Sequence, residues 1–197
     1  MYLINKPKEA AEKILQAIKD KNGKITYPID PFKILKEKKV IITFSNFDKL
    51  EGLLLFDKQK ESVVSINLNS RITRQRFTAA HELGHIMLHA EIKGVNFLCP
   101  ISGVKSAIER EVDDFASYLL MPSDELNKLI DKYQDENGNV GLDECLLIAE
   151  YFGVSFESCV KTIRFRLNRF VHQYNNRLLA KLITTIFYYK NMLSLLK

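Results

Sequence analysis

The sequence predicts an α+β fold, in which a small antiparallel sheet is followed by helices and by a helical C-terminal part. Three short runs of strand-forming residues lie between residues 40 and 68. A histidine-rich segment with helical periodicity follows them, and apolar residues at helical spacing dominate residues 109–197. We therefore expect a core over residues 1–135 and a helical segment over residues 136–197 that packs on that core.

Two helices are predicted before the sheet. Apolar residues at helical spacing predict a first helix over Lys6–Lys21, which an Asn-Gly pair ends. The second is short and covers Phe32–Lys38. Asp30 is a suitable N-cap for it, and Pro31 suits its first position because proline needs no partner for a missing N–H there.

The predicted strands are Val40–Phe44, Leu50–Phe56 and Ser62–Leu68. Short polar turns separate them, so an antiparallel arrangement is the simplest prediction. The third strand directly precedes the histidine-rich segment. It is either an exposed edge that could pair with an extended peptide, or an interior strand of the sheet.

The histidine-rich segment is predicted to form a helix from about Arg74 to Ala90, with Ser70 or Thr73 as its cap. A helical projection places its apolar residues on one side and its histidines on the other. Gly84 lies on the border between the two sides, where the missing side chain would let a neighbouring backbone approach closely.

This helix carries the motif His-Glu-x-x-His. Helical geometry places His81 and His85 one turn apart on the same face, where both imidazoles can bind one metal ion. Glu82 is adjacent and can take a proton from a water molecule that attacks a carbonyl. The motif thus predicts metal-assisted hydrolysis, and zinc is the expected metal.

A third protein ligand is expected from the next predicted helix, residues 109–122. Its projection directs Glu109 and Asp113 toward the buried side, and a buried carboxylate needs a partner such as a metal ion. Asp113 can accept the second ring N–H of a metal-binding histidine. Glu109 could instead stabilise the positive end of the helix, with Glu111 as the ligand in reserve. His89 points further round its own helix.

The two segments RQRFTAAHELGHIMLH and ERE-VDDFASYLLMP together resemble the ImmA/IrrE family of metallo-endopeptidases, over roughly residues 30–170. The resemblance implies a gluzincin-like zinc core, with His81, His85 and Glu109 as zinc ligands and Glu82 as the catalytic glutamate. The chain differs from most of the family at Val112-Asp113, where Ala-Asn is commoner. The residues before the first strand are too few for the helix-turn-helix module of many relatives, so the chain resembles the stand-alone form.

The same resemblance implies a protein substrate. Family members cleave a helix-turn-helix repressor, often one encoded on a phage or another mobile element. The two imidazoles and one carboxylate suit zinc, and they also suit iron, manganese or cobalt. His89 and His172 are candidates for stabilising the oxyanion.

The C-terminal part is basic and helical. Ser123 is expected to cap a helix that ends near Gln134, and a polar turn separates this helix from a pair over Leu142–Phe152 and Phe156–Phe170, with Ser155 as the cap of the second. A last apolar helix is expected over Val171–Leu196.

The net charge is +5, and the last forty residues, 158–197, hold eight bases and no acid. These bases fit the solvated faces of packed helices. The alternative function is a transcription or stress regulator that keeps the zinc fold as a scaffold and binds DNA through them.

Composition excludes other classes of protein. The three cysteines are widely spaced and odd in number, which favours reduced thiols over disulfides or a zinc finger. No run of about 18 apolar residues predicts a membrane span, and the N-terminus lacks the apolar core of a signal peptide. We therefore expect a cytoplasmic protein. Neither its oligomeric state nor its cleavage site can be inferred from the sequence.

Overall fold

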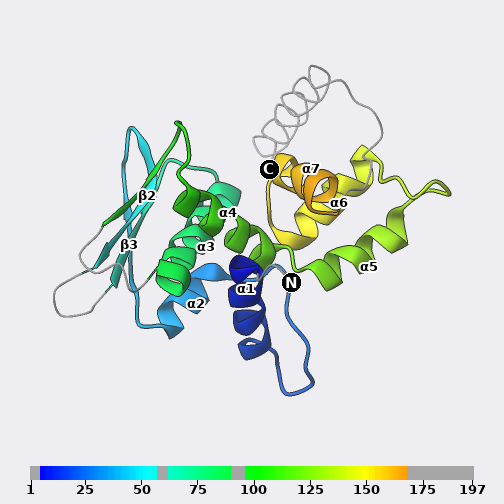
Figure 1. Ribbon diagram of the computed structural model, residues 1–197, viewed down its shortest axis with the longest axis horizontal. Coiled ribbons are helices and arrows are strands. Elements are labelled where there is room, and N and C mark those ends of the chain that lie inside the picture. Colours follow the sequence, from blue (N-terminus) through cyan, green and yellow to red (C-terminus); the bar gives the residue numbers. More distant parts are fainter. Residues whose placement is uncertain (1–4, 57–61, 90–95, 168–197) are drawn as a thin grey trace, which may run out of the picture.

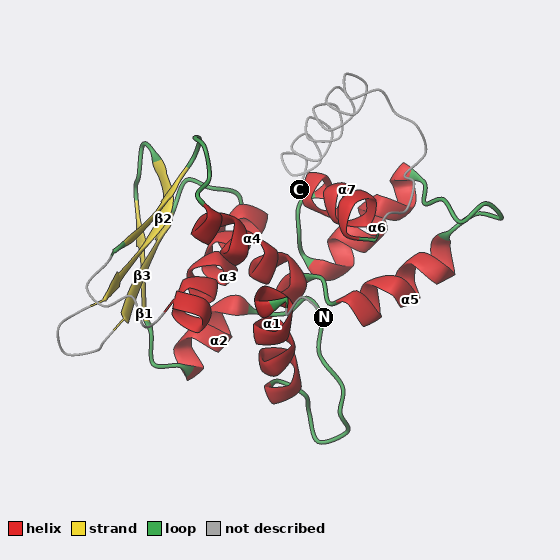
Figure 2. Ribbon diagram, in the orientation of Figure 1, coloured by secondary structure: helices red, strands yellow, loops and turns green. Residues whose placement is uncertain are grey.

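The computed structural model describes residues 5–56, 62–89 and 96–167, and it confirms the α+β class (Figure 1). The elements in chain order are α1 (Lys6–Ala17), α2 (Pro31–Glu37), β1 (Ile41–Ser45), β2 (Leu50–Phe56), β3 (Ser62–Asn67), α3 (Ile72–His89), β4 (Phe97–Pro100), α4 (Ala107–Leu120), α5 (Ser123–Tyr133), α6 (Leu142–Phe152), α7 (Phe156–Lys161) and a π-helical turn (Thr162–Arg166). The sheet forms one layer, helices α2 and α3 pack on one of its faces, and α4 lies on the same side against α3 (Figure 2).

Helices α1 and α2 begin at polar caps. The Asn5 side chain accepts a hydrogen bond from the Lys8 N–H at the start of α1. Helix α1 ends at Ala17, earlier than predicted, because the Asp20 carboxylate accepts the N–H groups of the following turn. The prediction for α2 is confirmed, since Asp30 caps the helix and proline occupies its first position.

The sheet has the strand order β1-β3-β2-β4, which corrects the prediction. Strand β1 pairs with β3 in parallel, and β2 pairs antiparallel with β3 and β4, so the sheet is mixed rather than antiparallel. The short turn between β1 and β2 suggested a hairpin. Burial decides otherwise: Val64 and Ile66 of β3 are both fully buried and take the interior position, whereas β1 is partly exposed and lies at the edge.

Strand β3 is therefore interior, and its backbone offers no free edge to a peptide. Of the two possibilities that the sequence left open, the structure selects the interior strand. The sheet ends at β1 on one side and at β4 on the other.

Strand β4 was not predicted. Phe97 and Cys99 are buried on the inner face of the sheet, whereas Leu98 and Pro100 point outward. Cys99 lies opposite Gly52 of β2. The strand is only four residues long and is held by pairing with β2, a tertiary interaction that local propensity does not report.

Helix α4 packs closely on α3 at Gly84, where side chains of α4, rather than the predicted backbone, meet the glycine. A Cβ at Gly84 would lie 3.0 Å from the Val112 Cβ and 3.0 Å from the Phe115 ring. The absent side chain thus sets how near the two helices can approach. This spacing determines the distance between the histidines of α3 and the carboxylates of α4.

The start of α3 is fixed to the sheet in a way that the sequence did not predict. The Ser70 hydroxyl donates to Glu51 of β2, and Thr73 lies inside the helix. The Gln75 side-chain amide instead donates to three backbone carbonyls of the preceding turn. Arg74 also pairs with Glu51 at 3.2 Å, so the first turn of α3 is held against β2.

The C-terminal helices follow the predicted order. Ser155 caps α7 by accepting the Ser158 N–H, as predicted. Ser123 does not cap α5: it is the first helical residue, and Pro122 occupies the cap. The remainder of the predicted helix to Phe170 and the predicted helix over Val171–Leu196 lie outside the described residues.

One cluster of buried apolar side chains extends from α1 to the π-helical turn. It includes residues on both sides of position 135, such as Leu119 of α4 and Phe152 of α6. The division into two segments at residue 135 stays a prediction. Within the described part of the chain, no helix has both the length and the apolar character needed to cross a membrane.

Candidate metal centre

The structure brings together the three side chains predicted to bind a metal. His81 and His85 lie one turn apart on α3 with ring centroids 5.0 Å apart, and both are almost fully buried. Glu109 of α4 lies between them. Its two carboxylate oxygens are 3.1 Å from His81 Nε2 and 3.3 Å from His85 Nε2. One ligand atom from each residue lies within 4.8 Å of the others.

These distances fit a small cation. Two ligand atoms bound at about 2.0–2.1 Å to a tetrahedral zinc ion are themselves about 3.3–3.4 Å apart. The His81 Nε2 atom is buried and, despite its short distance to Glu109, makes no well-aligned hydrogen bond. Short separation without hydrogen-bond alignment is expected of atoms that converge on a common point, so the residues present fit a metal ion.

The charges around the cluster also favour a cation. Burial lowers the pKa of His81, but interactions with Asp113, Cys99 and Glu109 outweigh burial and raise it to about 12. Burial opposes ionisation of Glu109, yet the two histidines lower the pKa of this carboxyl well below its usual value. Without a metal, a proton on His81 balances the carboxylates. A metal ion would replace that positive charge.

Asp113 holds the other side of the His81 ring. His81 Nδ1 lies 3.0 Å from Asp113 Oδ1, and the second carboxylate oxygen contacts the Lys105 ammonium group. A carboxylate at Nδ1 fixes the ring orientation and leaves Nε2 directed toward Glu109. Burial opposes ionisation of Asp113, but His81 and Lys105 together lower its pKa. The predicted Asp113–histidine contact is thus present in the geometry.

Glu82 is fully buried, and neither of its carboxylate oxygens has a hydrogen-bond partner. Burial raises its pKa to about 8, and the charge on His81 opposes this shift. A Cβ at Gly52 would lie 3.4 Å from Glu82 Oε1, so the glycine leaves room for the carboxylate against β2. A cation bound nearby would favour the ionised form.

The reserve candidates lie apart from this cluster. Glu111 is about half exposed, and its carboxylate faces His89 at 3.6 Å. The His89 ring is 5.8 Å from the His85 ring and belongs to neither group of potential metal ligands among the described residues. His172 lies outside the described residues. The geometry therefore favours Glu109 over Glu111.

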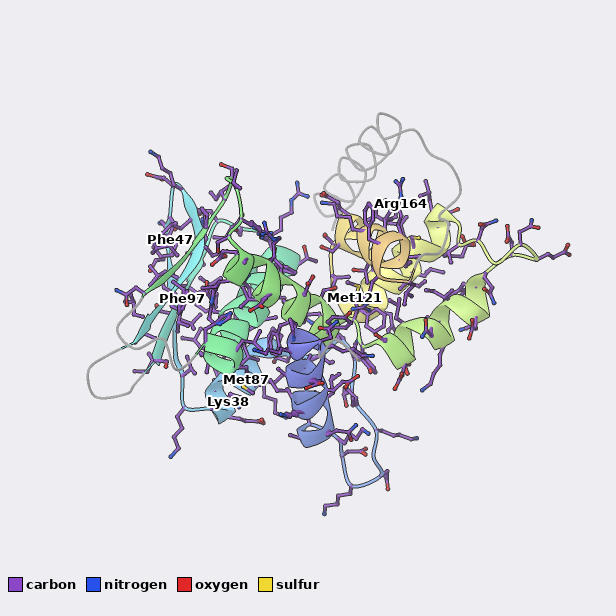
Figure 3. All side chains as sticks on the ribbon, viewed as in Figure 1. Lys38, Phe47, Met87, Phe97, Met121 and Arg164 are labelled. Atoms are coloured by element: carbon purple, nitrogen blue, oxygen red, sulfur yellow. The ribbon has the colours of Figure 1, made fainter. Side chains whose placement is uncertain are left out.

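Three residues at the site were not predicted from the sequence to lie there. Phe97 stacks on His85, with centroids 4.0 Å apart and planes 19° apart, and Figure 3 shows it between the sheet and α3. Cys99 forms a second potential ligand group with His81 and Glu82. Lys105 supports Asp113. Residues 97–100 read Phe-Leu-Cys-Pro, without the alternation of apolar and polar residues that would have indicated a half-buried strand.

Comparisons with known proteins point in the same direction. A family described as the IrrE N-terminal-like domain, a peptidase family, matches residues 35–164. Metallopeptidase ImmA of Bacillus subtilis (strain 168) is 28% identical over 99 residues, which are 50% of this chain and 58% of that protein. A Mycobacterium tuberculosis transcriptional regulator shares the fold, with a TM-score of 0.54 and 14% identity over 83% of this chain and 48% of that one. The chain thus spans less than two thirds of either protein.

Proposed function

Because the chain belongs to the peptidase family of the IrrE N-terminal-like domain, we propose that it is a zinc-dependent endopeptidase that cleaves a regulatory protein. This membership confirms the resemblance to the ImmA/IrrE family. The observation that carries the proposal is the convergence of His81, His85 and Glu109 beside the unpartnered carboxylate of Glu82. Two imidazoles and one carboxylate form a ligand set of catalytic zinc sites.

Four residues of the chain would hold and orient the metal. His81 and His85 would bind it through Nε2, and Glu109 through its carboxylate. Asp113 would keep the His81 ring in place by accepting the Nδ1–H. Bound zinc supplies Lewis-acid polarisation of the peptide carbonyl and lowers the pKa of a water molecule.

Glu82 would move the proton. Its carboxylate takes a proton from the attacking water and can pass it to the nitrogen of the departing amine. Burial suits this role because a carboxylate without hydrogen-bond partners is a stronger base than a solvated one. Gly52 of β2 has no side chain, so nothing at this position crowds the Glu82 carboxylate.

The proposed substrate is a helix-turn-helix repressor of phage or mobile-element type. Support comes from the sequence resemblance and from the relative that is named a metallopeptidase. An extended segment of the substrate could lie along β4. Strand β4 ends the sheet, and its inward side chains Phe97 and Cys99 face the histidines.

The alternative is a DNA-binding regulator. The Mycobacterium tuberculosis protein of similar structure is a transcriptional regulator. At 14% sequence identity, the similarity shows a shared fold but does not show a shared function. Arg166, one of the basic residues on the described C-terminal helices, makes contacts within the protein and is not directed toward a DNA partner. Its guanidinium donates to the backbone carbonyls of Ser117 and Met121 and lies over the Tyr118 ring. We therefore favour the peptidase.

Substitution of Glu82 tests the proposal. Wild-type protein and a Glu82→Gln variant are each incubated with zinc and a purified helix-turn-helix repressor encoded beside the chain's own gene. We expect the wild type to cleave the repressor at a defined bond. The variant should bind zinc with unchanged stoichiometry and lose at least about a hundredfold in cleavage rate, because it lacks the general base.

Glu111→Gln is the matched control, since it removes a nearby carboxylate that is half exposed and directed at His89. It should cleave like the wild type. Equal cleavage by wild type and Glu82→Gln would overturn the peptidase proposal. Salt-sensitive binding of duplex DNA without any cleavage would favour the alternative.

A further inference from the structure

Cys99 lies at the metal centre on the side occupied by Glu82. Its sulfur, a carboxylate oxygen of Glu82 and a ring nitrogen of His81 all lie within 4.8 Å of one another. His81 is common to this group and to the group of His81, His85 and Glu109. The thiol is therefore next to one proposed ligand, His81, and beside the proposed general base, whereas His85 and Glu109 belong only to the other group.

The sheet directs Cys99 into this position. Cys99 alternates with exposed neighbours along β4 and is 5% exposed. It lies opposite Gly52, and a Cβ at Gly52 would meet Glu82 Oε1 at 3.4 Å. Strand β2 thus presents no side chain between the thiol and Glu82. The sulfur reaches the site because its cross-strand partner is a glycine.

A second observation makes this arrangement more than a buried cysteine. Both oxygens of Glu82 are unpartnered and buried, and one of them lies within 4.8 Å of the Cys99 sulfur. A catalytic zinc site keeps one coordination position for water, and the base must lie next to that position. The thiol is on the same side, and thiolates are strong zinc ligands.

We propose that Cys99 is a fourth metal ligand in the resting protein, where its thiolate competes with water for the position beside Glu82. This inference rests on the proposed function. The thiol gives up its proton to solvent when it binds the metal, as any cysteine ligand must. The resting protein is then latent, and cleavage requires the sulfur to leave the metal.

Cobalt substitution tests the inference because a cobalt–thiolate bond gives an intense charge-transfer band in the near ultraviolet, which nitrogen and oxygen ligands do not produce. Metal-free protein is titrated with Co²⁺, and absorbance is followed to one equivalent. We expect the band in the wild type and its complete loss in Cys99→Ser and Cys99→Ala, with cobalt still bound by the other three ligands.

Cys159→Ser is the matched control. Cys159 is a buried free thiol on α7 that contacts Cys145, remote from the histidines. This variant should keep the band. Cleavage gives a second readout: Cys99→Ala should cleave several-fold faster than the wild type, because water no longer competes with sulfur.

The outcomes separate the two proposals. Bound cobalt without a thiolate band in the wild type would overturn the role of Cys99 and leave the peptidase proposal standing. A band that survives in Cys99→Ser, or slower cleavage by Cys99→Ala at full metal loading, would also overturn it. Failure of the wild type to bind any cobalt would overturn both.

Discussion

Glu82 is the residue whose burial is hardest to explain by stability alone. A carboxylate without hydrogen-bond partners destabilises a folded protein, and Glu82 is fully buried with two unpartnered oxygens. The rise in its pKa to about 8 reflects the same cost, because burial disfavours the ionised form. A nearby cation would offset part of this cost. The burial of Glu82 thus fits a residue that lowers the folding stability of the protein and serves catalysis instead.

A Glu82→Met variant tests this balance. Methionine has a similar shape and no polar group to leave unpartnered, so we expect the metal-free variant to be more stable than the wild type by about 1–3 kcal/mol. Chemical denaturation of both metal-free proteins measures the difference. Cleavage should be lost. Lower stability of the variant would show that Glu82 has a structural partner.

Asp113 orients the His81 ring through its contact with Nδ1. Asp113→Leu should weaken zinc affinity about 10- to 100-fold, because the His81 ring loses the acceptor at Nδ1. Asp113→Asn should lose less, since the amide oxygen still accepts the ring N–H. Competition with a chromophoric chelator measures both affinities. Equal affinities for the two variants would mean that Asp113 does not act through His81.

At the scale of elements, the contact between α3 and α4 sets the geometry of the metal centre. The two histidines belong to α3, and the carboxylates of Glu109 and Asp113 belong to α4, so the spacing of the helices fixes the distances between them. Gly84 sets this spacing because its position meets Val112 and Phe115. The geometry of the proposed metal centre therefore depends on Gly84, which is not itself one of the proposed ligands.

Gly84→Ala should separate the helices. In an exposed helix this change stabilises by about 1 kcal/mol, because alanine is the better helix former. Here the added methyl would crowd Val112 and Phe115, so we expect net destabilisation, by up to about 2 kcal/mol, and weaker zinc binding. Thermal unfolding and metal competition measure the two effects. A more stable variant with unchanged affinity would contradict the packing argument.

Sequence patterns predicted the elements with strong local signals and missed those fixed by distant contacts. The Asp30 cap and helix α6 follow from adjacent residues, and both were predicted correctly. Strand β4 and the interior place of β3 depend on strand pairing across the chain, which no local pattern contains.

The same division holds for the site. Helical periodicity grouped His81, Glu82 and His85, and it directed Glu109 inward. Cys99 and Phe97 reach the site through β4, so they could not be inferred. Lys105 contacts Asp113 from the loop before α4, and helical periodicity cannot predict which way a loop side chain points.

At the scale of the whole molecule, one buried apolar cluster joins the metal centre to the C-terminal helices. Two arginines add to this connection. Arg76 of α3 donates to the carbonyls of Gly153 and Ile29, and Arg166 donates to the carbonyls of Ser117 in α4 and of Met121 at its C-terminal cap. Helices α6 and α7 are thus tied to the two helices that carry the site.

This arrangement predicts cooperative unfolding. Urea denaturation followed by far-ultraviolet circular dichroism and by tyrosine fluorescence should give one transition with coincident midpoints, because a shared core unfolds as a unit. Two separate transitions would indicate that the segment from residue 136 onward unfolds independently of the metal centre. They would also favour a true domain boundary at residue 135.

We propose that His81, His85 and Glu109 bind a metal ion that makes the chain a hydrolase. The most direct measurement is the zinc affinity of Glu109→Gln compared with Glu111→Gln and the wild type, by competition with a chelator of known affinity. We predict one zinc per chain in the wild type and in Glu111→Gln, and a loss of at least about a hundredfold in affinity in Glu109→Gln, because a ligand is removed. Equal affinities in all three proteins, or no zinc bound by the wild type, would contradict a metal centre formed by these three residues.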